Sequence, residues 1–534
     1  MRLVRTCFVL LALLTTVNLA AASLRAQNEA RELWLIRAQN LTSDLLKDAT
    51  DLSAMQRAVL WGKLGERWWR EDPKRARAWL TNAIEVVEPV PNKETREERE
   101  ERLWAARVLL TIVTPLDQKL TKRLVPVLTD ERAGYGDALI DAAITIVNDD
   151  PKRAAELGAT ALRSGTTSQI RLLLAPLRAR DPKLADSLFI QALAQVKQNP
   201  GTMLANSLMY VAFPAQRGLS ADTPVPPEPL RAELLQAFLP LLNFDPANRD
   251  DPSATCGAVR WLAPLYGEFE RLLPQQMQIV RQAVNRCHWN DPVNQQRIND
   301  YTHNQSLDTV ESLLNAAAEA KDQQVRRDYE YRAAELAQEN KNYELALKIL
   351  DDMPKEQREA WGESWTLPRW GWAADGAIEH YQKKRFREMN LILDSVPSDL
   401  QPLAKASFVD RLREVTISET APILQVLNDA IKGLRKSSLP GADKYYWYFA
   451  LLKVTVKYQP ADANQVLKDA VAALNQFEYP TLVAAYVPFC DVGAPLLEMD
   501  EFIVKDAIAS VTIVPMRAQL RLSVLAATLQ RLKN

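Results

Sequence analysis

The chain has 534 residues, too many for one compact core, so several units or an array of repeats are expected. Its 66 basic residues balance 67 acidic ones, which argues against a nucleic-acid-binding protein or one that adheres to an anionic membrane surface. Only 16 glycines are present, so few turns need a positive φ, as in a protein built of helices joined by short loops.

The first residues have the parts of a secretory signal peptide. Arg2 and Arg5 form a positive region, Cys7–Val17 is a short apolar run, and small residues offer cleavage after Ala22 or Ala26. The apolar run is shorter than the roughly 20 residues that cross a bilayer. We therefore predict a periplasmic or secreted mature protein with no membrane span.

The first clear structural unit is Leu60–Pro89. Its residues follow two spacings, W-x2-L-G-x2-aromatic and then A-x3-L-x2-A, with these members: Trp61, Leu64, Gly65, Trp68, Ala76, Leu80 and Ala83. The pattern resembles the tetratricopeptide repeat, a helix–turn–helix unit of about 34 residues. Small Gly65 and Ala76 are expected where the two helices cross. Asp72 is expected to cap the second helix, with Pro73 as its first residue.

The second-helix pattern returns along the chain. It is found in three further stretches: residues 150–162, 181–193 and 460–474. Two other copies, Lys341–Pro354 and Lys384–Pro397, match each other more closely, and Tyr343 aligns with Phe386 at an offset of 43 residues. The resemblance implies an all-α fold, a right-handed superhelical solenoid of helix–turn–helix repeats. The alternative is a generic helical bundle in which these spacings reflect ordinary amphipathicity.

The middle of the chain departs from the repeat pattern. Arg217–Leu230 is rich in proline and is typical of an extended connection. Cys256 then opens a helical stretch, Pro274 marks a break, and the next helix ends at Cys287. Folded as an antiparallel hairpin, the two helices bring Cys256 and Cys287 together, which predicts a disulfide in an exported protein. The alternative is a pair of unbonded, buried thiols.

Four of the 13 tryptophans lie in "WGESWTLPRWGW". This stretch falls between the two closely matched repeat copies, so we interpret Lys355–Gly371 as an insertion at a junction between repeats. Pro368 and Gly371 argue that the insertion is not a simple helix. Residues 444–450, "KYYWYFA", form a second aromatic cluster.

Two interpretations of the tryptophan stretch compete. In the first, the rings fill a gap between neighbouring repeats, because an indole buries much apolar area. In the second, they line a groove for a peptide or a sugar, and Trp365 is the most accessible ring. The candidate binding residues are Trp361, Trp365, Arg369, Trp370 and Trp372.

Signatures of catalysis and metal binding are scarce. The three histidines, His288, His303 and His380, lack the spacing to cysteines or carboxylates that a zinc site requires. There is no phosphate-cradling glycine loop and no G-x-S-x-G elbow. The chain has many carboxylates, so a pair of them could in principle act as in a glycosidase, but no motif supports such chemistry. We predict no metal, no cofactor and no enzymatic activity.

These observations divide the chain into a signal peptide, N-terminal repeats, a connection with a helical hairpin, and C-terminal repeats, at residues 1–26, 27–216, 217–304 and 305–534. The predicted function is a scaffold or adaptor that binds a protein or peptide in the cell envelope. This inference rests on analogy between folds. The alternatives are a glycan-binding or glycan-cleaving envelope protein that uses Trp361–Trp372, and a purely architectural envelope component.

Overall fold

The computed structural model describes most of the chain after its first 28 residues. The described residues are 29–88, 94–129, 136–164, 168–214, 224–242, 253–262, 265–286, 309–320, 323–353, 363–412, 417, 419–476 and 492–532. Within these ranges all regular structure is helical, and no strand is present. The predicted signal peptide lies outside them. None of the helices searched in these ranges has the length and apolar character that crossing a membrane would demand.

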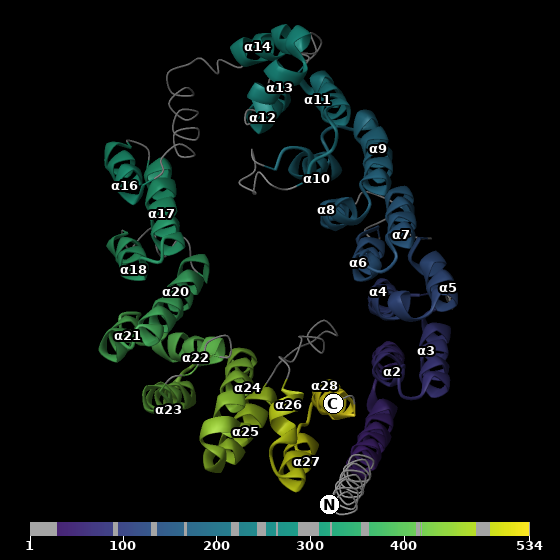
Figure 1. The fold of residues 1–534 in the computed structure, drawn as a ribbon, viewed down its shortest axis with the longest axis vertical. Helices are drawn as coiled ribbons and strands as arrows, with labels where there is room; N and C mark the ends of the chain where they lie inside the picture. Colours follow the sequence, from purple (N-terminus) through teal and green to yellow (C-terminus); the bar gives the residue numbers. More distant parts are fainter. Residues whose placement is uncertain are drawn as a thin grey trace, which may run out of the picture. The chain divides into compact units, whose positions relative to one another are not determined.

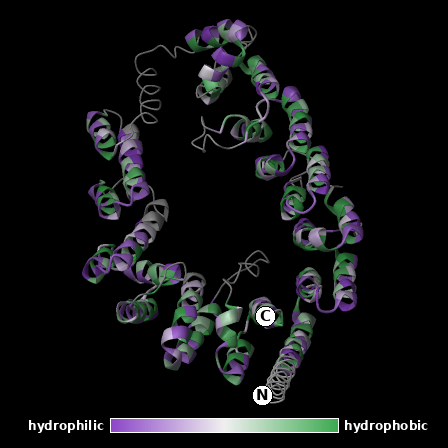
Figure 2. Ribbon diagram, in the orientation of Figure 1, coloured by the Kyte–Doolittle hydropathy of each residue, from purple (hydrophilic) through white to green (hydrophobic). Residues whose placement is uncertain are grey.

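The chain forms two compact units. One is Ala54–His303, and the other combines Met1–Ser53 with Asn304–Asn534. Hydrophobic and hydrophilic residues alternate around the helices (Figure 2), as expected of helices that bury one face against neighbours. The all-α prediction is therefore confirmed for the described residues.

In the unit Ala54–His303 the first eight helices pack in consecutive pairs. The first members of the pairs, α2, α4, α6 and α8, also contact one another in order. The α-helices labelled in Figure 1 are α2 (Ala54–Trp68), α3 (Pro73–Val87), α4 (Arg96–Leu116), α5 (Gln118–Thr129), α6 (Gly136–Ile146), α7 (Pro151–Ser164), α8 (Ile170–Arg180), α9 (Pro182–Gln198), α10 (Met203–Ala212), α11 (Glu228–Leu242), α12 (Ser253–Leu262), α13 (Tyr266–Leu272) and α14 (Met277–Arg286). A short 3-10 helix, η5 (Pro274–Gln276), lies between α13 and α14.

The first predicted repeat is α2 followed by α3. The Asp72 carboxylate accepts a hydrogen bond from the Arg75 backbone N–H at 3.0 Å, and Pro73 is the first residue of α3. A Cβ built on Gly65 would lie 2.5 Å from Cγ of Leu80 and 3.0 Å from the carbonyl oxygen of Ala76. Gly65 is thus small because α3 passes against it, and the predicted crossing is confirmed.

The predicted cysteine hairpin differs from the structure in its first helix. The stretch from Cys256 to Leu273 is two helices, α12 and α13, rather than one. Pro264 lies between them, and a proline removes a helical N–H donor and clashes with the preceding turn. Cys256 is disulfide-bonded. Helix α14 contacts α12 and ends one residue before Cys287, as the predicted pairing requires. Because Cys287 itself lies outside the described residues, its bond to Cys256 stays a prediction.

The second unit contains the other described helices. Residues 29–48 form a helix that continues into η1, and the C-terminal part also consists of paired helices. Its elements are η1 (Ala49–Asp51), α16 (Val310–Glu319), α17 (Gln323–Glu339), α18 (Tyr343–Asp352), α20 (Glu363–Gln382), α21 (Phe386–Asp394), α22 (Gln401–Arg411), α23 (Ala421–Lys436), α24 (Gly441–Tyr458), α25 (Pro460–Leu474), α26 (Gly493–Leu497), α27 (Glu501–Ala509) and α28 (Val514–Arg531).

The two closely matched repeat copies have the same turn. Lys341 and Lys384 precede α18 and α21 with φ of 60° and 57°, and they lie 43 residues apart. After each lysine, the next residue donates a backbone hydrogen bond five residues back, Asn342 to Ala337 and Arg385 to His380. This is the Schellman ending of a helix, which usually places glycine at the positive-φ position. The predicted offset of 43 residues is therefore confirmed by the backbone.

Candidate aromatic binding site

The tryptophan stretch is helical where the structure describes it. Helix α20 begins at Glu363 and runs through Pro368 and Gly371 to Gln382, so the prediction that this segment is not a simple helix is wrong. Pro368 is the sixth residue of α20, so its missing N–H removes one bond near the start of the helix. Gly371 is buried, and packing of this helix outweighs the low propensity of both residues.

Two of the predicted site residues cannot be placed as side chains. Trp361 lies outside the described residues, as does the first part of the predicted insertion, residues 355–362. Trp365 lies in α20, but the structure describes only its backbone. The prediction that Trp365 is the most accessible ring therefore stays a prediction.

Trp370 meets the second aromatic cluster of the sequence. Its ring lies edge-to-face with that of Trp447 on α24, with centroids 5.4 Å apart and planes at 88°. Tyr446 and Trp447 are also edge-to-face, at 5.0 Å and 88°. This is the favoured arrangement of aromatic quadrupoles. We call Trp370, Tyr446 and Trp447 the aromatic cluster.

Repeat packing explains how residues so distant in sequence come together. Helix α22 contacts both α20 and α24, so three first helices of successive pairs lie in a row. Trp370 and Tyr446 are half-buried, whereas Trp447 is 9% exposed. The next residue, Tyr448, is buried, and burial raises the pKa of its hydroxyl to about 12, with a further contribution from Asp469. The cluster is thus the partly open edge of a packed core.

Trp372 and Arg369 connect α20 to its neighbours. Trp372 is half-buried and packs against both apolar cores of this unit, one around α16–α18 and one that extends from α18 to α28. Arg369 is 3% exposed and forms an ion pair with Asp351 at the end of α18. A buried guanidinium needs such a partner. Both residues therefore connect neighbouring helices, Trp372 by apolar packing and Arg369 by its ion pair with Asp351.

A polar group next to Trp370 was missed by the sequence analysis. Arg411 of α22 forms an ion pair with Asp375 of α20, and both side chains are about one-third exposed. A Cβ on Gly371 would lie 3.6 Å from Nη2 of Arg411, so the guanidinium lies against the residue that follows Trp370. Burial raises the pKa of nearby Tyr343, and the charge of Asp375 adds to this shift. Only the packing of α20 on α22 brings these groups together.

Comparisons with known proteins add no family. No protein-family model and no curated protein matches the chain. Among the described residues, no group of three or more histidine, cysteine, aspartate or glutamate side chains is arranged to hold a metal ion.

Proposed function

We propose that the chain is an exported scaffold of tetratricopeptide-like repeats, wound as a right-handed superhelix, that binds a protein or peptide partner. The contact pattern supports this proposal, because each helix pair touches the next pair along the chain within its unit. Such stacking produces extended surfaces for binding. The aromatic cluster is the part of that surface on which the proposal depends most.

The observation that carries the proposal is the exposure of the aromatic cluster beside a dense core. Tyr445 and Phe449 on α24 are 4% and 2% exposed, yet Trp370 and Tyr446 remain half-open. Tryptophan and tyrosine at the edge of a well-packed surface are the residues most enriched in binding hot spots. Because Trp447 holds the Trp370 ring in place, little side-chain entropy is lost when a partner covers it.

The same geometry favours a peptide over a glycan. Sugar stacking needs an open ring face, and Trp447 is only 9% exposed. The rings of Trp370 and Trp447 are perpendicular to each other, so the pair does not form a flat stacking platform. The Arg411–Asp375 pair beside them supplies a donor and an acceptor for a peptide backbone.

A photo-crosslinking experiment in the native envelope tests the proposal. A crosslinking amino acid at Tyr446 should capture a protein partner, and the same group at Leu391, which is 60% exposed on α21, should not. Trp370→Ala should reduce capture at Tyr446. Equal capture at Tyr446 and Leu391 would contradict the proposal. Quenching of tryptophan fluorescence by cell-wall sugars, without protein capture, would favour the glycan alternative.

The predicted role of Trp365 has its own test. If its ring contacts the partner, Trp365→Ala should weaken binding by about 2 kcal/mol and leave the melting temperature nearly unchanged. If the ring fills a gap between repeats, the same substitution should cost about 3–5 kcal/mol of stability. A melting curve and a binding curve of this variant distinguish the two.

A further inference from the structure

The N-terminal helix belongs to the same unit as the C-terminal helices. Residues 29–53 are grouped with Asn304–Asn534, although the unit Ala54–His303 separates them in sequence. The buried side of this segment repeats every three or four residues, with Ala38, Thr42, Leu45, Asp48, Ala49 and Leu52 as its buried members. This period is that of an amphipathic helix lying on a surface.

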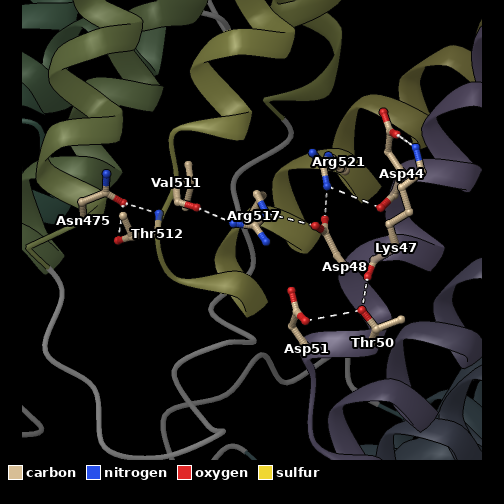
Figure 3. Close-up of polar contacts among 10 residues, drawn as sticks. All are labelled: Asp44, Lys47, Asp48, Thr50, Asp51, Asn475, Val511, Thr512, Arg517 and Arg521. Carbon is tan, nitrogen blue, oxygen red and sulfur yellow. Dashed lines mark hydrogen bonds and ion pairs between the residues drawn. The ribbon is translucent and has the colours of Figure 1, made fainter.

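Asp48 is the polar centre of this contact (Figure 3). It is 5% exposed, and its carboxylate pairs with two guanidiniums of α28. Nε of Arg517 donates to Oδ1 at 3.0 Å, and Nη1 of Arg521 donates to Oδ2. Nη1 of Arg521 also lies 3.4 Å from the carbonyl oxygen of Asp44. The carboxylate of one N-terminal residue thus accepts hydrogen bonds from two arginines of the C-terminal helix.

Arg517 also makes a contact within the C-terminal part of the unit that does not involve residues 29–53. Nη1 of Arg517 donates to the Val511 carbonyl at 2.9 Å. The next residue, Thr512, is held by Asn475 of the α25 end, whose Oδ1 accepts from the Thr512 backbone N–H at 2.9 Å. Figure 3 shows this row of polar contacts continuing from Asn475 to Asp48. Arg517, one of the two cations of the site, is therefore held by the C-terminal part of the unit as well as by Asp48.

Contacts near the start of the helix extend the docking surface. Nε of Arg37 lies 3.7 Å from Oε2 of Glu501 at the start of α27. Leu41 packs against the large apolar core that contains Val504, Ile508 and Leu520 of α27 and α28. Apolar packing, one ion pair and the Asp48 contact therefore act along a single helix.

The covalent chain does not hold this segment in place. After Ser53 the chain leaves for the other unit and returns only at Asn304. Residues 29–53 are consequently attached to α27 and α28 by non-covalent contacts. The Asp48 carboxylate is buried between two partly exposed guanidiniums, so removing it leaves two like charges side by side without their common partner.

We propose that residues 29–53 are a dissociable latch, and that α27 and α28 form a binding site for an amphipathic helix that places a carboxylate between Arg517 and Arg521. In the isolated chain its own N-terminal helix fills this site. A partner helix with the same pattern, apolar at three- and four-residue steps and ending in an acidic residue, competes for it and displaces residues 29–53.

The test uses the full chain with a protease site inserted between Ser53 and Ala54, which are both exposed. After cleavage, the latch should remain bound on gel filtration. A fluorescent peptide of residues 29–53 should then exchange into the site, and this exchange is measured by anisotropy. Asp48→Arg in the peptide should weaken its binding at least 100-fold. The substitution is made in the peptide, so the protein's own fold is unaffected.

A matched control isolates the role of Asp48. Asp44→Arg makes the same charge change one turn earlier, but the Asp44 carboxylate pairs locally with Lys47 at 3.1 Å. This peptide should bind within about threefold of the unmodified one. Equal binding of the Asp48→Arg and Asp44→Arg peptides would overturn the proposal. So would failure of the peptide to exchange, or unfolding of the cleaved chain, because either would make residues 29–53 a fixed part of the core.

Discussion

Substitution of Gly65 probes the repeat at its tightest point. A methyl group at this position would lie 2.5 Å from Cγ and 2.8 Å from Cδ2 of Leu80, and 3.0 Å from the backbone oxygen of Ala76. Carbon atoms pack at about 3.5–4.0 Å, so Leu80 would have to move by about 1 Å inside a fully buried site. The backbone oxygen cannot yield as a side chain can, so α2 and α3 would have to separate.

The expected effect is the difference between two terms. Overpacking of a core typically costs about 1–3 kcal/mol, and replacing a mid-helix glycine returns about 1 kcal/mol of helix propensity. Gly65→Leu, which adds the most atoms, should therefore lower the free energy of unfolding by about 1–3 kcal/mol, and Gly65→Ala by less. Urea unfolding followed by ellipticity at 222 nm measures both.

A second glycine of the same unit provides the control. Gly257, in the middle of α12, is exposed, and a Cβ there would meet nothing within 4 Å. Gly257→Ala should raise stability by up to about 1 kcal/mol, because only the propensity term remains. If Gly65→Leu and Gly257→Ala shifted stability in the same direction, the assignment of Gly65 to the helix crossing would be refuted.

Three further predictions follow from single residues. Lys384→Gly should raise the free energy of unfolding by about 0.5–1 kcal/mol in urea unfolding, because glycine adopts φ near 57° without strain; a loss would contradict this reading of the turn. Burial raises the pKa of Tyr448 to about 12, so the folded state favours the neutral phenol. This contribution to the free energy of unfolding is complete below about pH 10, the ordinary tyrosine pKa, and is lost as the pH rises toward 12. Tyr448→Phe should therefore reduce the fall in melting temperature between about pH 10 and about pH 12. Thiol titration of the denatured, unreduced exported protein should find one free thiol, that of Cys490, if Cys256 pairs with Cys287; a count that leaves the Cys287 thiol free would reject that pairing.

The local features of the repeats could be predicted from sequence because they depend on neighbours within one helical pair. The Asp72 cap and the Gly65 crossing each join residues within one helical pair. The 43-residue offset of Tyr343 and Phe386 reflects two copies of one local pattern, and the turns at Lys341 and Lys384 repeat at the same offset. Helix period, capping chemistry and small-residue positions carry that information directly. The prediction for Pro368 and Gly371 failed because local propensity there is outweighed by packing.

What only the tertiary structure decided is which distant surfaces meet. The sequence marked two aromatic clusters separately, and repeat packing places Trp370 against Trp447. It likewise places Asp48 between Arg517 and Arg521, a contact that spans more than 460 residues. Amphipathic spacing shows that a helix has a face to bury, but the partner of that face is chosen by complementary shape and charge among all the helices. Local sequence patterns therefore determine the helical class of the fold and its repeating unit, and the packing of distant helices determines where the candidate sites lie.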